Sequence, residues 1–286
     1  MVFGLLATLA ALALAHAIYV AVTRRRFPPA GERIATRDGS LHVLRAGHGP
    51  VVLFVHGANG CLHDFAGPLL ADLARDHTVL ALDRPGHGWS PRPRGPLDLA
   101  ANARAVLAAA RAFAGVEPVV LVGHSYGAAV AVRAALDAPQ AVRGVVAVAP
   151  CALVDGRNVH YTRWPLPPGA AGATLAWLAT LPVCLPFASQ ARRDAWHPAA
   201  APPGWTPSRA FALTPAQVRA SAENFRHLPA DLDALARDLP RLAPPLVVIA
   251  GAADRITPAG THAQALAARA PGARLEVVPD VGHWLP

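Results

Sequence analysis

A serine stands between two glycines in the stretch Gly-His-Ser-Tyr-Gly at residues 123–127. An unbroken apolar run, 119–122, precedes it and an alanine-rich helical pattern, 128–132, follows it. This pattern predicts a strand, a sharp turn and a helix. The glycines allow the backbone to turn tightly enough to lift the hydroxyl of Ser125 out of the sheet. A serine hydroxyl is a poor nucleophile at neutral pH, so it needs a base, a group that orients the base, and an oxyanion hole.

An acid and a base follow later in the chain. The apolar run 246–250 predicts a buried strand, and Asp254 lies just past its carboxyl end, where open α/β sheets place functional groups. His283 follows the short strand predicted at 275–278 and is expected on a loop. Ser125, Asp254 and His283 could therefore form a nucleophile, acid and base for acyl transfer.

Two other aspartates compete for the role of the acid. Asp155 comes soon after the strand predicted at 145–148, and Asp280 is close to His283 in the sequence. We favour Asp254, keep Asp155 as a minor competitor, and expect Asp280 to be a turn residue.

The chain order Ser125, Asp254, His283 resembles that of the α/β-hydrolase superfamily, and the resemblance covers roughly residues 40–286. Residues 56–60 read His-Gly-Ala-Asn-Gly after an apolar run and resemble the oxyanion loop of this family. The resemblance implies that Ser125 is the nucleophile, Asp254 the acid and His283 the base. It also implies that the backbone N–H groups of Ala58 and Tyr126 donate to the oxyanion.

A second turn carries part of the same resemblance. Residues 83–90 match the family's D-x-P-G-x-G-x-S turn, which is structural in the family, and we assign it no chemistry. Three histidines near these motifs are also expected to be structural. We expect His124 to pack beneath the nucleophile turn, His56 to order the oxyanion loop and His87 to line the 83–90 turn.

The resemblance implies a mostly parallel α/β sheet of about eight strands with helices on both faces. We expect a helical cap and an amino-terminal membrane helix in addition to this fold. The opening strands are predicted as a hairpin around Asp38-Gly39. The expected divisions are a membrane anchor or signal at 1–26, core at 27–150, cap at 151–243 and core again at 244–286.

The segment 151–243 interrupts the alternation of strands and helices. Its many prolines break long helices, so we expect short helices joined by stiff turns, with 171–181 and 215–227 as the best candidates. The segment holds four of the chain's six tryptophans. These are Trp164, Trp177, Trp196 and Trp205. They either pack the cap's own core or line an apolar acyl pocket.

Serine at position 125 narrows the chemistry. Relatives that open epoxides or displace halides attack with an aspartate at this turn, whereas serine fits acyl transfer. The leading hypothesis is a serine hydrolase that cleaves an apolar carboxylic ester, of lipid or acyl-glycerol type, through an acyl-enzyme. A carbon–carbon bond hydrolase and an acyltransferase or perhydrolase with the same triad are alternatives. A member that binds a ligand without catalysis is an alternative from another class.

The composition argues against several classes of partner and cofactor. The net charge is +8, and all 26 basic residues are arginine. Because these arginines are scattered outside residues 24–26, we expect no nucleic-acid partner. Cys61, Cys151 and Cys184 have no metal-ligand spacing and are odd in number, and no glycine-rich phosphate loop is visible. We therefore expect neither a cofactor nor a metal, and the oligomeric state stays open.

The amino-terminal sequence predicts a membrane segment. Residues 2–22 carry no charge and would span about 31 Å as a helix, which matches the hydrocarbon core of a bilayer. Arg24, Arg25 and Arg26 follow, so the positive-inside rule predicts a single-pass anchor with a cytoplasmic catalytic domain. The small residues around Ala15 also fit a cleaved signal peptide, which would make the protein secreted or periplasmic. A helix packed on the domain or on a partner is the third interpretation.

Overall fold

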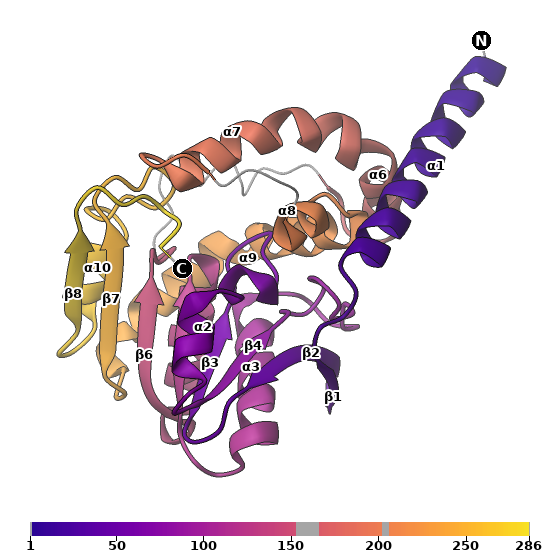
Figure 1. Ribbon diagram of the computed structural model, residues 1–286. Coiled ribbons are helices and arrows are strands. Elements are labelled where there is room, and N and C mark those ends of the chain that lie inside the picture. Colours follow the sequence, from indigo (N-terminus) through magenta and orange to yellow (C-terminus); the bar gives the residue numbers. More distant parts are fainter. Residues whose placement is uncertain (1, 153–165, 202–205, 286) are drawn as a thin grey trace.

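The computed structural model describes residues 2–152, 166–201 and 206–285. Within these ranges the chain forms one sheet of eight strands (Figure 1). The strands are β1 (Glu32–Thr36), β2 (Gly39–Ala46), β3 (Val51–Val55), β4 (Thr78–Leu82), β5 (Val119–His124), β6 (Val142–Val148), β7 (Leu246–Gly251) and β8 (Arg274–Val278).

The strand order is β1-β2-β4-β3-β5-β6-β7-β8. β1 and β2 form the predicted hairpin, β2 is antiparallel to β4, and the remaining neighbours are parallel. The carboxyl ends of the parallel strands therefore lie at one edge of the sheet. The segments that follow β3, β5, β7 and β8 leave from this edge and include all five predicted site residues. The mostly parallel α/β fold predicted from the sequence is confirmed.

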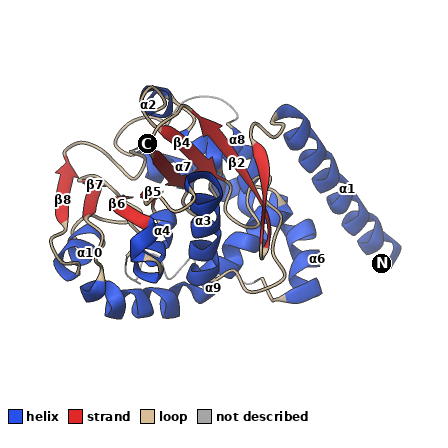
Figure 2. Ribbon diagram, turned by 90° about the horizontal axis from the view of Figure 1, so that it is seen from below, coloured by secondary structure: helices blue, strands red, loops and turns tan. Residues whose placement is uncertain are grey.

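Helices cover both faces of the sheet (Figure 2). The alanine-rich helices α3 and α4 pack with α10 and the second half of α9 on one face, and η1 and α2 cover the other. Small side chains let α3 and α4 approach the apolar strands closely. The helices are α1 (Val2–Arg26), α2 (Pro68–Leu73), α3 (Leu99–Ala114), α4 (Tyr126–Asp137), α6 (Gly169–Ala179), α7 (Leu185–Trp196), α8 (Pro207–Ala212), α9 (Pro215–Asp238) and α10 (Ala263–Arg269), with short turns η1 (Leu62–Phe65), η2 (Pro139–Ala141), η3 (Thr180–Cys184) and η4 (Leu239–Arg241).

α9 is longer than the sequence predicts. The expected helix ends at residue 227, whereas the helix continues to Asp238 with Pro229 inside it. A proline in a helix removes one backbone hydrogen bond. The second half of α9 nevertheless buries an apolar stripe against the main core, and this burial outweighs the loss; the stripe consists of Leu228, Leu232 and Leu235.

α1 projects from the body beside α6 and α8 (Figure 1). In the part of the chain that the structure describes, two helical stretches are long and apolar enough to cross a membrane, Leu6–Arg26 and Gly169–Trp196. The first is the predicted membrane segment. The second joins α6, η3 and α7, and it belongs to the segment predicted to be the cap.

Candidate active site

Ser125 occupies the turn between β5 and α4. Its φ of 55° and ψ of −118° lie in a region that non-glycine residues rarely adopt. A Cβ at Gly123 would lie 2.3 Å from the carbonyl oxygen of Gly127, and one at Gly127 would lie 2.1 Å from that of Val55. The two glycines are therefore required because the backbone passes too close to itself and to β3 for any larger residue.

Asp254 and His283 are in direct contact. The Nδ1 atom of His283 lies 2.8 Å from Oδ2 of Asp254. Oδ1 of the same carboxylate accepts the N–H groups of Ile256 and Thr257 at 2.7 and 2.9 Å. Burial raises the pKa of Asp254, but the hydrogen bonds from His283 and these N–H groups outweigh it, and the net pKa lies below its ordinary value. The ionised carboxylate thus holds the proton of His283 on Nδ1 and leaves Nε2 free to accept one.

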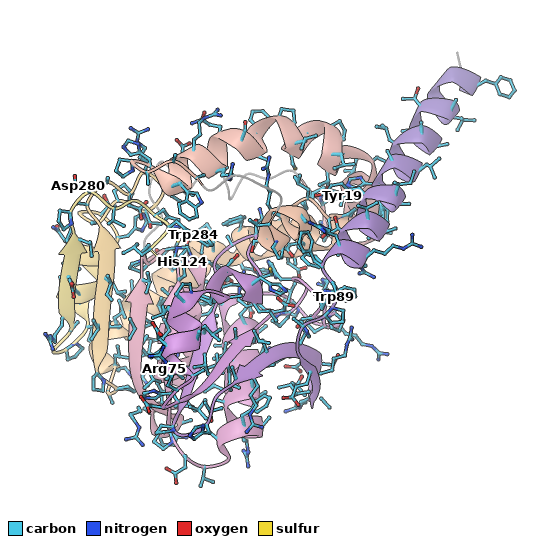
Figure 3. The ribbon with its side chains drawn as sticks, in the orientation of Figure 1. Tyr19, Arg75, Trp89, His124, Asp280 and Trp284 are labelled. Atoms are coloured by element: carbon cyan, nitrogen blue, oxygen red, sulfur yellow. The ribbon has the colours of Figure 1, made fainter. Side chains whose placement is uncertain are left out.

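Of the two competing acids, the structure describes Asp280. Asp280 is an exposed residue with a φ of 56°, at the tip of the loop after β8 (Figure 3). This left-handed conformation is typical of a turn, as expected. Asp155 lies outside the described residues.

His124 supports the loop that carries His283. Its Nε2 atom donates to the carbonyl oxygen of His283 at 2.9 Å, and its ring packs against those of His283 and Trp284. Figure 3 shows His124 and Trp284 side by side at the carboxyl edge of the sheet. Burial, with repulsion from His283, lowers the pKa of His124 to about 3. The ring is therefore neutral, which fits a structural role.

No hydrogen bond joins the Ser125 hydroxyl to His283, or to any other group within the described ranges. Catalytic hydrogen bonds are often long in a free enzyme and tighten when substrate binds. The structure thus brings the predicted acid and base together and places the predicted nucleophile at the same edge of the sheet.

The 56–60 loop borders Ser125. A Cβ at Gly57 would lie 3.1 Å from the Cβ atom of Ser125. Among the described residues, no hydrogen bond occupies the backbone N–H of Ala58 or Tyr126. Both N–H groups are therefore available to an incoming oxygen, as an oxyanion hole requires.

Arg84 holds this loop from behind. Its Nε and Nη2 atoms donate to the carbonyl oxygens of His56 and Gly57 at 3.0 and 2.9 Å, and its backbone N–H donates to Nε2 of His56 at 2.9 Å. His56 in turn donates from Nδ1 to the oxygen of Gly57, since Nε2 is an acceptor. The predicted ordering role of His56 matches these contacts.

The guanidinium of Arg84 also reaches three other elements. Nη1 donates to Oδ1 of Asn102 on α3 and of Asn224 on α9, both at 2.9 Å, and the group lies 4.7 Å from the centre of the Tyr126 ring. Burial lowers the pKa of Arg84 to about 10, so the group stays charged at neutral pH. In the described ranges no carboxylate forms an ion pair with it.

Sequence reasoning missed Arg84 because it assigned the 83–90 turn no chemistry. An arginine at the end of a strand is usually a solvated surface residue. Only the three-dimensional packing reveals that this one is buried, so the sequence offers no signal for it.

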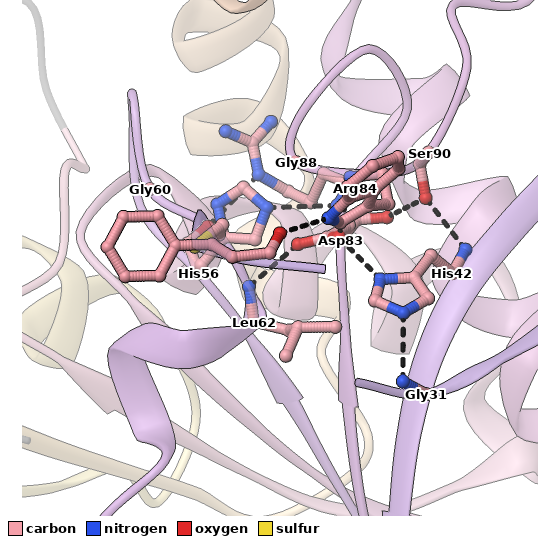
Figure 4. Close-up of polar contacts among 12 residues, drawn as sticks. Gly31, His42, His56, Gly60, Leu62, Asp83, Arg84, Gly88 and Ser90 are labelled. Atoms are coloured by element: carbon pink, nitrogen blue, oxygen red, sulfur yellow. Dashed lines mark hydrogen bonds and ion pairs between the residues drawn. The ribbon is translucent and has the colours of Figure 1, made fainter. Parts of the chain in front are cut away.

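Asp83 fixes the 83–90 turn itself (Figure 4). Its Oδ2 atom accepts from Nδ1 of His42 at 2.7 Å and from the N–H of Trp89 at 2.8 Å. Oδ1 accepts from the N–H of Leu62 at 2.8 Å. A Cβ at Gly88 would lie 2.3 Å from this carboxylate, and Gly88 has a φ of 51°. These contacts are structural and keep Arg84 in place.

Asp64 lies beside the 56–60 loop, and its pKa is raised toward neutrality. Its carboxylate accepts the N–H of Cys61 at 3.3 Å and contacts the hydroxyl of Ser208. Burial raises the pKa of Asp64 to about 7, although these hydrogen bonds lower it. The unfolded chain ionises the same carboxyl near its ordinary value of about 3.9.

Stability should therefore depend on pH through Asp64. Between about pH 4 and 7 the folded protein binds more protons than the unfolded chain, so the free energy of unfolding falls as the pH rises and levels off above that window. The shift corresponds to roughly 4 kcal/mol. Asp64→Asn keeps an acceptor but does not titrate, so urea unfolding at several pH values should show a flatter decline. Equal pH slopes in the variant and the parent would contradict this assignment.

The fold and these contacts agree with comparisons to known proteins. A family model described as "alpha/beta hydrolase fold" matches residues 50–286. The chain therefore belongs to the α/β hydrolase fold family, and it is a hydrolase of this type. The family resemblance read from the sequence is confirmed.

Particular relatives support this assignment. The chain is 30% identical over 266 residues to a pimeloyl-[acyl-carrier protein] methyl ester esterase of Xylella fastidiosa, covering 85% of this chain and 90% of the relative. A dihydrolipoyllysine-residue acetyltransferase component of the acetoin cleaving system of Cupriavidus necator is 39% identical over 121 residues, but the match covers 42% of this chain and only 32% of that protein. A hydrolase structure from Pseudomonas aeruginosa superposes with a TM-score of 0.67 at 27% identity, covering 88% of this chain and 91% of the other.

Proposed function

We propose that this protein is a membrane-associated serine hydrolase that cleaves an apolar carboxylic ester through an acyl-enzyme. The observation that carries the proposal is the contact between Asp254 and His283 at the sheet edge where Ser125 occupies a strained turn. An esterase among the relatives of similar length also supports it.

The proposed reaction has two halves. Nε2 of His283 takes the proton of Ser125 as its oxygen attacks the ester carbonyl, while the N–H groups of Ala58 and Tyr126 stabilise the oxyanion. His283 then returns the proton to the leaving alcohol. Water, deprotonated by His283, attacks the acyl-enzyme, the acid leaves and Ser125 regains its proton. Throughout, Asp254 stabilises the imidazolium form of His283.

The proposal for an apolar acyl group rests on the surroundings of His283. Trp284 packs against His124 and stacks on Trp196 of α7, with ring centres 5.8 Å apart. The backbone N–H of Trp284 donates to the carbonyl oxygen of Ala195 at 3.0 Å. We propose that residues 151–243 form the cap and that Trp196 and Trp284 contribute an apolar wall beside the base. Trp177 instead contacts His16 of α1, and Trp164 and Trp205 lie outside the described residues.

Esters of longer acids should be better substrates than acetate. Each methylene buried in an apolar pocket contributes about 0.8 kcal/mol, which is up to about fourfold in kcat/KM. A series of p-nitrophenyl esters that differ only in the acyl chain measures this effect at constant leaving group. A clear preference for the acetyl ester would contradict an apolar acyl site.

We also propose that α1 is a single-pass anchor that leaves the catalytic domain in the cytoplasm. Its apolar stretch is near the amino terminus, and Arg24, Arg25 and Arg26 lie in its last turn. The protein should stay in the membrane pellet after high-salt and alkaline washes, with its amino terminus intact by mass spectrometry. A mature chain that begins near Ile18 would indicate a cleaved signal instead.

A further inference from the structure

The stretch Gly169–Trp196, which we call the cap arm, carries an unusual apolar surface. It consists of α6, η3 and α7, and residues 169–191 carry no charge. Large apolar side chains on it are between 40% and 68% exposed, with Phe187 the most exposed. Large apolar side chains exposed in such number on one stretch are typical of an interaction site; they are Leu175, Trp177, Val183, Leu185 and Phe187.

Few residues of the cap arm face the interior. In the described chain, only Gly172, Ala176 and Thr180 of α6 and η3 are buried, and α7 buries none. The arm arches over the carboxyl edge of the sheet, from the side of α1 to the side of β7 and β8 (Figure 1). Apart from Ala176, which packs against Val218 and Ala222 of α9, the large apolar side chains of the arm therefore contribute little to the core of the domain.

α1 docks on this arm through buried polar contacts. The His16 side chain is 1% exposed. Its Nδ1 atom lies 2.6 Å from the carbonyl oxygen of Trp177, and its ring meets the Trp177 ring edge-on at 5.8 Å. A second contact joins α1 to α8, where the Tyr19 hydroxyl donates to the carbonyl oxygen of Ala210 at 2.9 Å. A polar side chain can lie at membrane depth when it is paired in this way.

The candidate membrane span in α1 contains the docking point. His16 and Tyr19 both lie inside the stretch Leu6–Arg26, which has 21 residues. A helix of that length rises about 31 Å, about the thickness of the hydrocarbon core. If this stretch spans the core, the contact between His16 and Trp177 lies at membrane depth and holds the α6 end of the arm close to the bilayer.

We propose that the cap arm is a second membrane contact, and that its exposed apolar side chains lie at the boundary of headgroups and acyl chains in the leaflet next to the catalytic domain. The proposal rests on the anchor role proposed for α1. Basic residues follow both apolar stretches: Arg24, Arg25 and Arg26 lie in the last turn of α1, and Arg192 and Arg193 come after residue 191. They complement anionic headgroups. An acyl substrate can then reach the cap from the bilayer without crossing water.

Environment-sensitive probes test the position of the arm in the full-length protein. Single cysteines replace Phe187 on the arm, Leu6 on α1 and Val116 in a Cys184→Ala background, and each is labelled with nitrobenzoxadiazole in vesicles of phosphatidylcholine and phosphatidylglycerol. Val116 is the matched control because it is 92% exposed and precedes β5, at the opposite end of the sheet. Hydrolysis of a water-soluble ester by each variant shows that it has folded.

Probes at positions 187 and 6 should emit at shorter wavelength than the probe at position 116 and lose fluorescence when the lipids carry bromine on their acyl chains. A quenched probe at position 6 with an unquenched, water-like probe at position 187 would overturn the arm contact and leave the anchor standing. A water-like probe at position 6 would overturn the anchor, and the arm proposal with it. A blue-shifted probe at position 187 that bromine does not quench would assign the surface to a protein, such as a second copy, and overturn the proposal.

A charge on the arm gives an independent readout. Phe187→Glu should lower the hydrolysis of a long-chain ester embedded in vesicles several-fold while leaving a water-soluble ester unaffected, because the carboxylate resists burial in lipid. Val116→Glu should change neither rate. Equal rates for Phe187→Glu and the parent on the embedded ester would contradict the proposal.

Discussion

Replacing Ser125 with alanine should lower kcat by at least about 10⁴-fold, because the acyl-enzyme cannot form without the serine oxygen. The fold should be unaffected, since alanine has the same backbone preference and the hydroxyl makes no hydrogen bond to any described residue. Ester hydrolysis followed over long times measures the residual kcat, and thermal unfolding measures the stability of the variant. Hydrolysis near the parent rate would remove Ser125 from the mechanism.

Glycine at the same position separates strain from chemistry. Because Ser125 has a φ of 55°, Ser125→Gly should be inactive but more stable than Ser125→Ala, by about 1 kcal/mol. Ala149, with a φ of 44°, offers a matched control. Ala149→Gly should be more stable than the parent by a similar free energy of unfolding and should keep its activity. Equal stability of Ser125→Gly and Ser125→Ala would show that the turn stores no strain.

Replacing Arg84 with methionine should lower both stability and turnover. The change removes the donors that Arg84 supplies to the carbonyl oxygens of His56 and Gly57 and to the amide oxygens of Asn102 and Asn224, and a buried acceptor left unpaired costs about 1–3 kcal/mol. The oxyanion loop then loses its support, so kcat of the folded fraction should fall about 10²-fold or more. KM for a soluble ester should change little, because the effect falls on the transition state.

Two variants sharpen the test of Arg84. Arg84→Lys keeps the charge but not the fork of donors, so it should be intermediate in kcat. Arg92→Met removes an arginine that also reaches α9, through Glu223 at 2.7 Å, but that does not touch the oxyanion loop. Its kcat should stay close to that of the parent. If Arg84→Met folds and keeps the parent kcat, the arginine serves stability alone.

Much of the fold could be predicted from local pattern. The apolar runs before residues 56, 125 and 254 are long and bounded by glycine-containing turns, so strands and their order are readable from the chain. The contact between Asp254 and His283 follows from the same logic, because parallel strands end at one edge. The helix through Pro229 was not predictable, since a proline signals a break and only tertiary burial reverses it.

Other features depend on packing between distant segments. Arg84 becomes a buried support of the oxyanion loop only because α3 and α9 bring Asn102 and Asn224 to it. The docking of His16 on Trp177 joins residues 161 positions apart, and each lies in an apolar segment that reads as an independent helix. Periodicity describes one element at a time and contains no information about such contacts.

The central claim is that Ser125 is an activated nucleophile, and covalent labelling tests it most directly. The full-length protein in membranes is treated with a fluorophosphonate, digested and analysed by mass spectrometry, beside Ser125→Ala and His283→Ala. We predict one phosphonylated site, Ser125, with no labelling of Ser125→Ala and much slower labelling of His283→Ala. An unlabelled parent protein, or a label on another residue that persists in Ser125→Ala, would contradict the claim.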